Sequence, residues 1–230
     1  MTQWEVLKRE AKEKVAHLLP NRTFDDFEDP NSRMLIAVTC LQRGEKELAY
    51  DLFETVAAEG PFDNENRRFA YVRSLVELAE MDAEKEQFES AEQRMGTALA
   101  DFPEGMDYMM SRTHLDVYLT YYRFRLGKRK EAENELKTLI QREEERFREH
   151  HPEDGRNLVG PGLCYAIHQL SLFHAEQGDW AAAVEIFRRL RPYAAAVDDE
   201  GWNKADRLVQ EGSHEEAYQK LSESVSYGAG

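Results

Sequence analysis

The segment YYRFRLGKRK contains the side chains of this sequence best suited to bind a charged or aromatic ligand. Arginines and lysines alternate there with aromatic rings, and such interleaving can stack on bases or hold phosphate and carboxylate groups. Cations are also favoured at the C-terminus of a helix, where they stabilise the helix dipole. The cluster is therefore either a ligand site or a charged helix end. Its cations are Arg123, Arg125, Lys128, Arg129 and Lys130.

Catalytic and metal-binding patterns are not found among the remaining polar residues. His150 and His151 are adjacent, so on a helix they point in different directions. His168 and His174 are six residues apart and do not share a helix face. The sequence contains no HExxH pattern, glycine-rich phosphate loop or GxSxG elbow. We therefore expect no catalytic residue, no metal, no cofactor and no enzyme activity.

Charge and composition limit the class of partner. The net charge of −15 repels a phosphate backbone, so nucleic acid is not an expected partner. No apolar run is long enough to span a membrane, so a membrane is not an expected partner either. The acidity either keeps the protein soluble or provides an acidic face for a basic peptide. Cys40 and Cys164 lie in apolar helical patterns and are interpreted as buried small side chains, not as a disulfide framework. Together with the charged start of the chain, they predict a cytoplasmic protein.

A recurring pattern indicates the elements that position these residues. Glycine follows an apolar helical stretch, alanine comes five residues later, and a large apolar residue comes four residues after the alanine. Glycine commonly ends a helix, and the alanine allows the next helix to approach closely. The pattern predicts stacked helical hairpins. Its copies are Gly44/Ala49/Phe53, Gly127/Ala132/Leu136, Gly178/Ala183/Phe187 and Gly212/Ala217/Leu221, and Ala91/Met95 is a copy without the glycine.

The sequence predicts helices along nearly the whole chain. An amphipathic helix over 2–18, with Thr2 and Glu5 in capping-box spacing, precedes a loop over 19–31. The expected pairs are 32–43 with 45–58, 65–84 with 87–101, 106–126 with 128–150, 162–177 with 179–195, and 200–211 with 213–226. The GPG at 160–162 is interpreted as a turn, no strand is expected, and the tail YGAG is expected to fray.

The order of glycine, alanine, aromatic residue and closing proline resembles the tetratricopeptide repeat (TPR). The best match is LCYAIHQLSLFHAEQGDWAAAVEIFRRLRPYA, and the resemblance covers 30–226. It implies an all-α fold, a right-handed α-solenoid of about four to five antiparallel helix hairpins, as one domain over 1–230. The helix within 1–20 either caps the first hairpin or pairs with another chain, so the oligomeric state stays open. Only Gly178 and Gly212 have the standard spacing, which makes the repeats degenerate.

The resemblance also implies a non-enzymatic scaffold that binds a protein or peptide segment in a concave groove lined by the first helix of each pair. The alternative is a regulatory sensor that responds to a small ligand or peptide. The carboxylate clamp of some chaperone-binding arrays is absent, because its positions hold Met34, Val76, Val117, His168 and Trp202. Tyrosines at helical spacing in the first helices of the pairs could instead simply pack between helices. The groove residues implied are Arg73, Glu77, Glu80, Tyr118, Tyr121, Arg125, Tyr165, His168 and Gln169.

Overall fold

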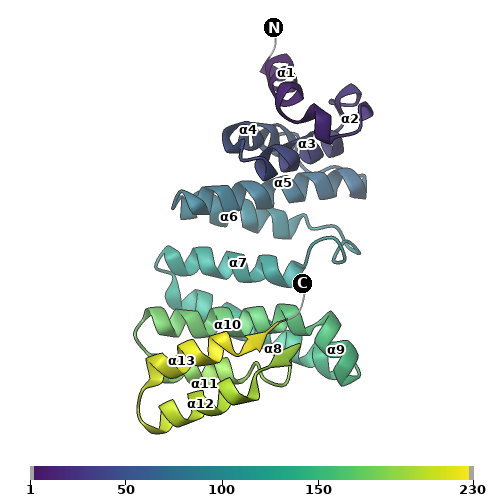
Figure 1. The fold of residues 1–230 in the computed structure, drawn as a ribbon. Helices are drawn as coiled ribbons and strands as arrows, with labels where there is room; N and C mark the ends of the chain where they lie inside the picture. The colour runs from purple at the N-terminus through teal and green to yellow at the C-terminus, as the bar shows by residue number, and fades with distance from the viewer. Residues whose placement is uncertain (1–2, 228–230) are drawn as a thin grey trace. The chain divides into compact units, whose positions relative to one another are not determined.

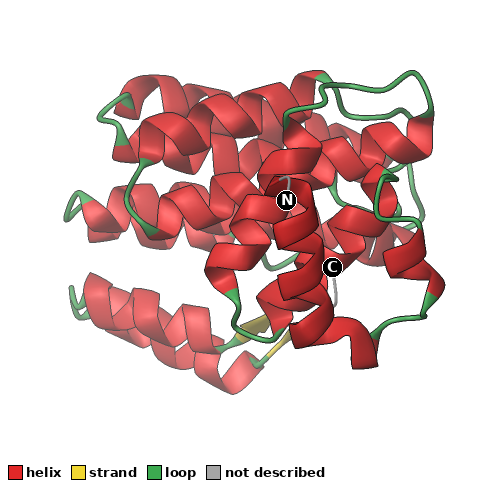
Figure 2. Cartoon of the chain, turned by 90° about the horizontal axis from the view of Figure 1, so that it is seen from above, coloured by secondary structure: helices red, strands yellow, loops and turns green. Residues whose placement is uncertain are grey.

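The computed structural model describes residues 3–227, and most of them lie in helices (Figure 1). Contacts between residues divide the chain into two compact units, Met1–Met110 and Ser111–Gly230. Figure 2 shows the helices in red and one short pair of strands in yellow. The expected single domain over 1–230 stays a prediction, and the two units are described separately.

The N-terminal unit is built from two helix hairpins and an N-terminal helix. The long helix α5 packs on α6 and on the preceding hairpin, and α1 packs on α3 and α4. Leu7, Ala11 and Val15 of α1 are buried in the same core as Ile36 and Phe53, so α1 covers an apolar face of the first hairpin. The helices are α1 (Gln3–Val15), α2 (Arg22–Asp25), α3 (Pro30–Gln42), α4 (Lys46–Ala57), α5 (Glu65–Glu84) and α6 (Phe88–Ala100), with a 3-10 turn over Ala16–Leu18.

The C-terminal unit contains three hairpins that stack in sequence. Helix α10 packs on both α7 and α8, and α11 packs on α13. Phe173 is fully buried and stacks on Phe124 of α7, with ring centroids 4.0 Å apart. The elements are α7 (Arg112–Arg125), α8 (Arg129–Arg148), α9 (Pro152–Leu158), α10 (Gly160–Glu176), α11 (Trp180–Arg188), β1 (Ala196–Val197), α12 (Asp199–Gln210), α13 (His214–Glu223) and β2 (Val225–Ser226).

The turn of each hairpin has the same backbone geometry. The four glycines of the recurring pattern have φ between +77° and +82° and follow the first helix of their pair, as the sequence predicts. In the copy without glycine, Glu86 occupies the corresponding position with a φ of 59°. The left-handed turn is therefore kept even where a side chain makes it costly. The glycines are Gly44, Gly127, Gly178 and Gly212.

Several predicted boundaries are wrong. The helix expected over 106–126 begins only at Arg112, because Gly105 has a φ of +82° and the Ser111 side chain caps the amide of His114. The GPG at 160–162 forms the buried first turn of α10. The helix expected over 179–195 ends at Arg188. Further elements that were not expected are α2, which lies within the predicted loop over 19–31, the helix α9 and the β1–β2 pair. The Thr2 cap and residues 228–230 of the tail lie outside the described residues.

Candidate functional site

Most of the predicted groove residues of the C-terminal unit lie on two neighbouring helix faces. On α7, residues 114, 118, 121 and 125 repeat at helical spacing, and the same holds for 165 and 168 on α10. None of these side chains is fully buried, whereas Leu115, Val117 and Phe124 of α7 are. We call this set the aromatic face. It consists of His114, Tyr118, Tyr121, Arg125, Tyr165 and His168.

Three rings join the two helices at the N-terminal end of the aromatic face. The His114 ring stacks on Tyr165 with centroids 4.9 Å apart, and Tyr118 meets Tyr165 edge-on at 5.9 Å. Burial lowers the pKa of His114. Its Nδ1 is buried and has no hydrogen-bond partner among the described residues. The sequence reasoning missed His114, although its position four residues before Tyr118 places it on the same face.

Tyr121 and Arg125 form a local pair at the other end of α7. The Arg125 guanidinium donates to the Tyr121 hydroxyl at 2.8 Å, and its carbon lies 5.8 Å from the centroid of the same ring. Tyr121 is half-buried and Arg125 is exposed. This pairing orients a cationic group next to an aromatic ring, an arrangement that can receive a carboxylate or a carbonyl group of a ligand.

His168 of α10 is held by residues from later in the chain. Its Nδ1 lies 2.8 Å from the Tyr227 hydroxyl, and its ring meets Phe187 edge-on with centroids 5.3 Å apart. Burial of the imidazole lowers the pKa of His168 to about 4. The ring is therefore neutral near pH 7, and it orients Tyr227 without contributing a charge. Tyr227 belongs to the segment predicted to fray, so that expectation is wrong for this residue.

The remaining predicted residues lie elsewhere. Gln169 is only 8% exposed, so it belongs to the packing between helices. In the N-terminal unit, Arg73 forms an ion pair with the buried Glu77, and its other nitrogen lies 3.7 Å from the sulfur of Met110. Glu80 of the same helix is exposed. The structure thus brings together Tyr118, Tyr121, Arg125, Tyr165 and His168 on α7 and α10.

The basic cluster is divided between separate environments. Arg123 pairs with Glu135 of α8, and the Arg129 guanidinium lies 5.5 Å from the centroid of the Phe124 ring.

Both cysteines are buried and free, and burial raises the pKa of Cys40 to about 11 and that of Cys164 to about 12. Thiols with so high a pKa are poor nucleophiles near neutral pH, which agrees with their interpretation as buried small side chains.

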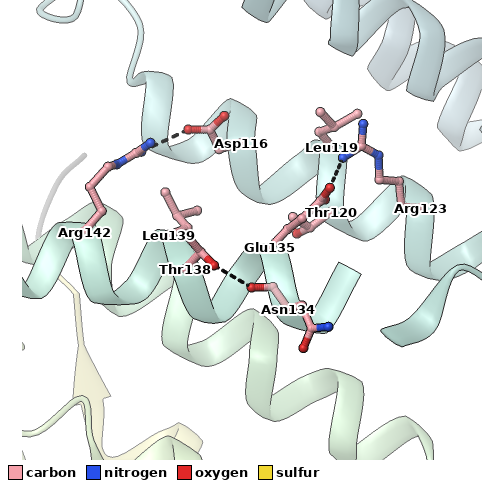
Figure 3. Close-up of a pocket in the computed structure, with 9 residues that line it drawn as sticks. All are labelled: Asp116, Leu119, Thr120, Arg123, Asn134, Glu135, Thr138, Leu139 and Arg142. Atoms are coloured by element: carbon pink, nitrogen blue, oxygen red, sulfur yellow. Dashed lines mark hydrogen bonds and ion pairs between the residues drawn. The ribbon is translucent and has the colours of Figure 1, made fainter. Parts of the chain in front are cut away.

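A second feature of the hairpin α7–α8 is an open pocket of about 390 Å³ (Figure 3). Leu119 and Leu139 are among its lining residues. Two ion pairs link its helices, Arg142 with Asp116 at 3.1 Å and Arg123 with Glu135. Residues 116, 119, 120 and 123 repeat at helical spacing on the side of α7 opposite to the aromatic face. The sequence reasoning missed this pocket, because the charges of α8 alternate as they do on any solvated helix.

Residues 3–227 contain no candidate metal site and no candidate membrane span. Over that range no three histidine, cysteine, aspartate or glutamate side chains are grouped so that they could hold a metal ion. No helix in the described part of the chain combines the length and the apolar character needed to cross a membrane.

Comparisons with known proteins give structural neighbours only. No protein-family model matches the chain, and no curated protein matches it. Among solved structures it is similar to YrrB, described as a TPR protein with an unusual peptide-binding site, with a TM-score of 0.48 and 14% identity. The match covers 95% of this chain and 90% of that chain. The stacked hairpins with their glycine turns and closely packed alanines make the fold TPR-like and all-α.

Proposed function

We propose that this protein is a non-enzymatic scaffold that binds a protein or peptide segment on the aromatic face of α7 and α10. The observation that carries the proposal is the contact of His114, Tyr118 and Tyr165, which forms a continuous layer of partly exposed rings across two helices. Rings fixed by neighbouring rings lose little conformational entropy when a ligand covers them. Tyrosine and arginine are also the residue types enriched at binding hot spots.

The chemistry of the face favours a polypeptide ligand. The rings provide apolar area for a side chain, and the Arg125 guanidinium provides donors for a carbonyl or carboxylate oxygen. The neutral His168 adds a polar group without a charge. A sensor that encloses a small ligand would require a pocket around Arg125 and His168. Arg125 is exposed and pairs with Tyr121 of its own helix, which suits an open face better than an enclosed site, so we favour the scaffold over the sensor.

A reducing compartment is part of the same proposal. Cys40 and Cys164 are buried in different units and form no disulfide. Free buried thiols are typical of cytosolic proteins, and the cytoplasm therefore remains the proposed location.

The covered apolar face of α1 supports a capping role for this helix within its own chain.

Binding to an array of random peptides tests the proposed function. The wild-type chain is compared with Tyr121→Ala and Arg125→Ala, and with Arg207→Ala as a matched control on an exposed arginine of α12. We expect peptides retained by the wild type to bind Tyr121→Ala and Arg125→Ala about tenfold more weakly or worse, as for hot-spot residues. Binding by Arg207→Ala should be unchanged. Peptide binding that neither α7 substitution alters would refute the assignment of the site.

A further inference from the structure

The last described residues of the chain fold back onto the C-terminal unit as an extended segment. Strand β2 pairs antiparallel with β1, with Ala196 opposite Ser226 and Val197 opposite Val225. The amide of Ala195 donates to the Ser226 carbonyl at 3.0 Å, and the amide of Asp198 donates to the Ser224 carbonyl at 2.8 Å. The segment is thus attached by backbone hydrogen bonds, the usual way in which an added strand is held at a sheet edge.

The segment is also fitted closely by its side chains. Ser224 is 3% exposed and lies against Gly201 of α12, where a Cβ atom would come within 2.1 Å of the serine oxygen. Val225 packs against the core of the C-terminal unit. Only a small residue fits at the first position, and an apolar residue is favoured at the second. We call the surroundings of Ser224–Tyr227 the tail site.

Tyr227 links the tail site to the aromatic face. Its hydroxyl is hydrogen-bonded to His168, and the two ring centroids are 5.6 Å apart. Burial raises the pKa of Tyr227, so the hydroxyl keeps its proton and can donate to the neutral imidazole. One of the residues predicted to contact a ligand is therefore already occupied by the chain itself.

We propose that the tail site is a binding site for an extended peptide, and that Ser224–Tyr227 occupies it as an internal ligand. The recognised pattern is a small residue, an apolar residue, any residue and then a tyrosine. An external segment of this pattern would add a strand to β1, place its small residue against Gly201 and donate its tyrosine hydroxyl to His168. The inference rests on the proposed function only in taking α10 as a helix that receives a polypeptide. The internal segment competes at an effective concentration on the order of millimolar, so the closed chain binds such peptides weakly.

A labelled peptide with the chain's own sequence SESVSY, residues 222–227, is the probe. Its binding is measured by fluorescence anisotropy on three full-length chains: the wild type, the opened variant Val225→Gly with Tyr227→Ala, and the control Tyr108→Ala. Tyr108 is 79% exposed in the N-terminal unit, so the control loses a tyrosine without opening the tail. We expect the opened variant to bind at least about tenfold more tightly than the other two.

Two further comparisons test the chemistry of recognition. The peptide SESVSF, which lacks the hydroxyl, should bind the opened variant about fivefold more weakly, and adding His168→Ala to that variant should abolish the difference between the two peptides. A scrambled peptide of the same composition should not bind. Equal affinity of SESVSY for the three chains, or binding of the scrambled peptide, would overturn the inference.

Folding and the proposed function are checked separately. If the opened variant loses its helical circular dichroism, the full chain Tyr227→Phe replaces it, because this change keeps the ring and removes only the hydroxyl. We then expect SESVSY to bind this chain at least about threefold more tightly than the wild type, and equal affinity would overturn the inference. The opened chain can bind SESVSY while no peptide on the array depends on Tyr121 for its binding. That result would support the tail site and refute the proposed function.

Discussion

The side chains of the aromatic face are partly buried, and their exposure and hydrogen-bond partners depend on the helices packed around them. Tyr118, Tyr121 and Tyr165 can be assigned to one side of their helices from spacing alone, and the structure places them there. Spacing does not reveal that Gln169 is buried, because its exposure depends on the helices that pack around it. It also does not reveal the bond from Tyr227 to His168, whose partners are 59 residues apart.

Protonation of His168 should make the folded state less stable in mild acid. Its pKa is lowered from 6.5 to about 4 by burial. Above pH 6.5 the ring is neutral in both states and has no effect. Between pH 6.5 and 4 the unfolded chain binds a proton that the folded chain does not, so stability falls as the pH falls. From pH 7 to pH 5 this group should lower the free energy of unfolding by about 1–2 kcal/mol.

Urea denaturation at pH 7 and pH 5 measures this effect. Other groups titrate over the same interval, so the relevant quantity is the difference between the wild type and His168→Gln, which keeps an acceptor for Tyr227 but does not titrate. The variant should lose less stability than the wild type between the two pH values. The same loss in both chains would show that the imidazole is not buried as described.

Among the elements, the hairpin turns follow the sequence most closely. Four of them use glycine in the left-handed region, and the hairpin α5–α6 uses Glu86 in the same conformation. The glycine-free copy therefore folds like the others, because the packing of α5 on α6 compensates for the unfavourable backbone. A left-handed residue other than glycine costs roughly 1–2 kcal/mol.

Replacing Glu86 by glycine should stabilise the protein. The substitution removes the backbone strain, while the greater freedom of glycine in the unfolded chain offsets part of the gain. We expect the free energy of unfolding to rise by about 0.5–1 kcal/mol, measured from the urea midpoint. Glu89→Gly, in the first turn of α6, is the matched control and should lower the free energy by a similar amount. Destabilisation by Glu86→Gly would mean that the glutamate side chain contributes more than the turn geometry costs.

For the molecule as a whole, the division at residue 110 raises the question of independent folding. The large core that contains Phe173, Phe187 and Trp202 is formed only by residues of the C-terminal unit. A unit of this length with its own core is within the range of autonomous domains. The core that contains Phe53 and Leu78 belongs in the same way to the N-terminal unit.

The fragment 111–230 should therefore fold alone. We expect helical circular dichroism, a cooperative urea transition, and retention of the tyrosine–histidine contacts of the aromatic face by nuclear magnetic resonance. The fragment 1–110 provides the complementary measurement. Fragments that are helical but lack a cooperative transition would contradict this expectation and support the single domain over 1–230.

The helical class, the hairpins and most of their turns follow from the sequence alone, because helix periodicity, glycine turns and closely packed alanines are local features of the repeats. The spacing of tyrosine and arginine along α7 likewise indicates which face of that helix carries them. The accessibility of those residues, the position of the α7–α8 pocket, and the return of Ser224–Tyr227 to β1 and His168 depend on the packed structure. Burial and strand pairing are contacts between residues far apart in the chain, and a local sequence pattern does not indicate which residues those are.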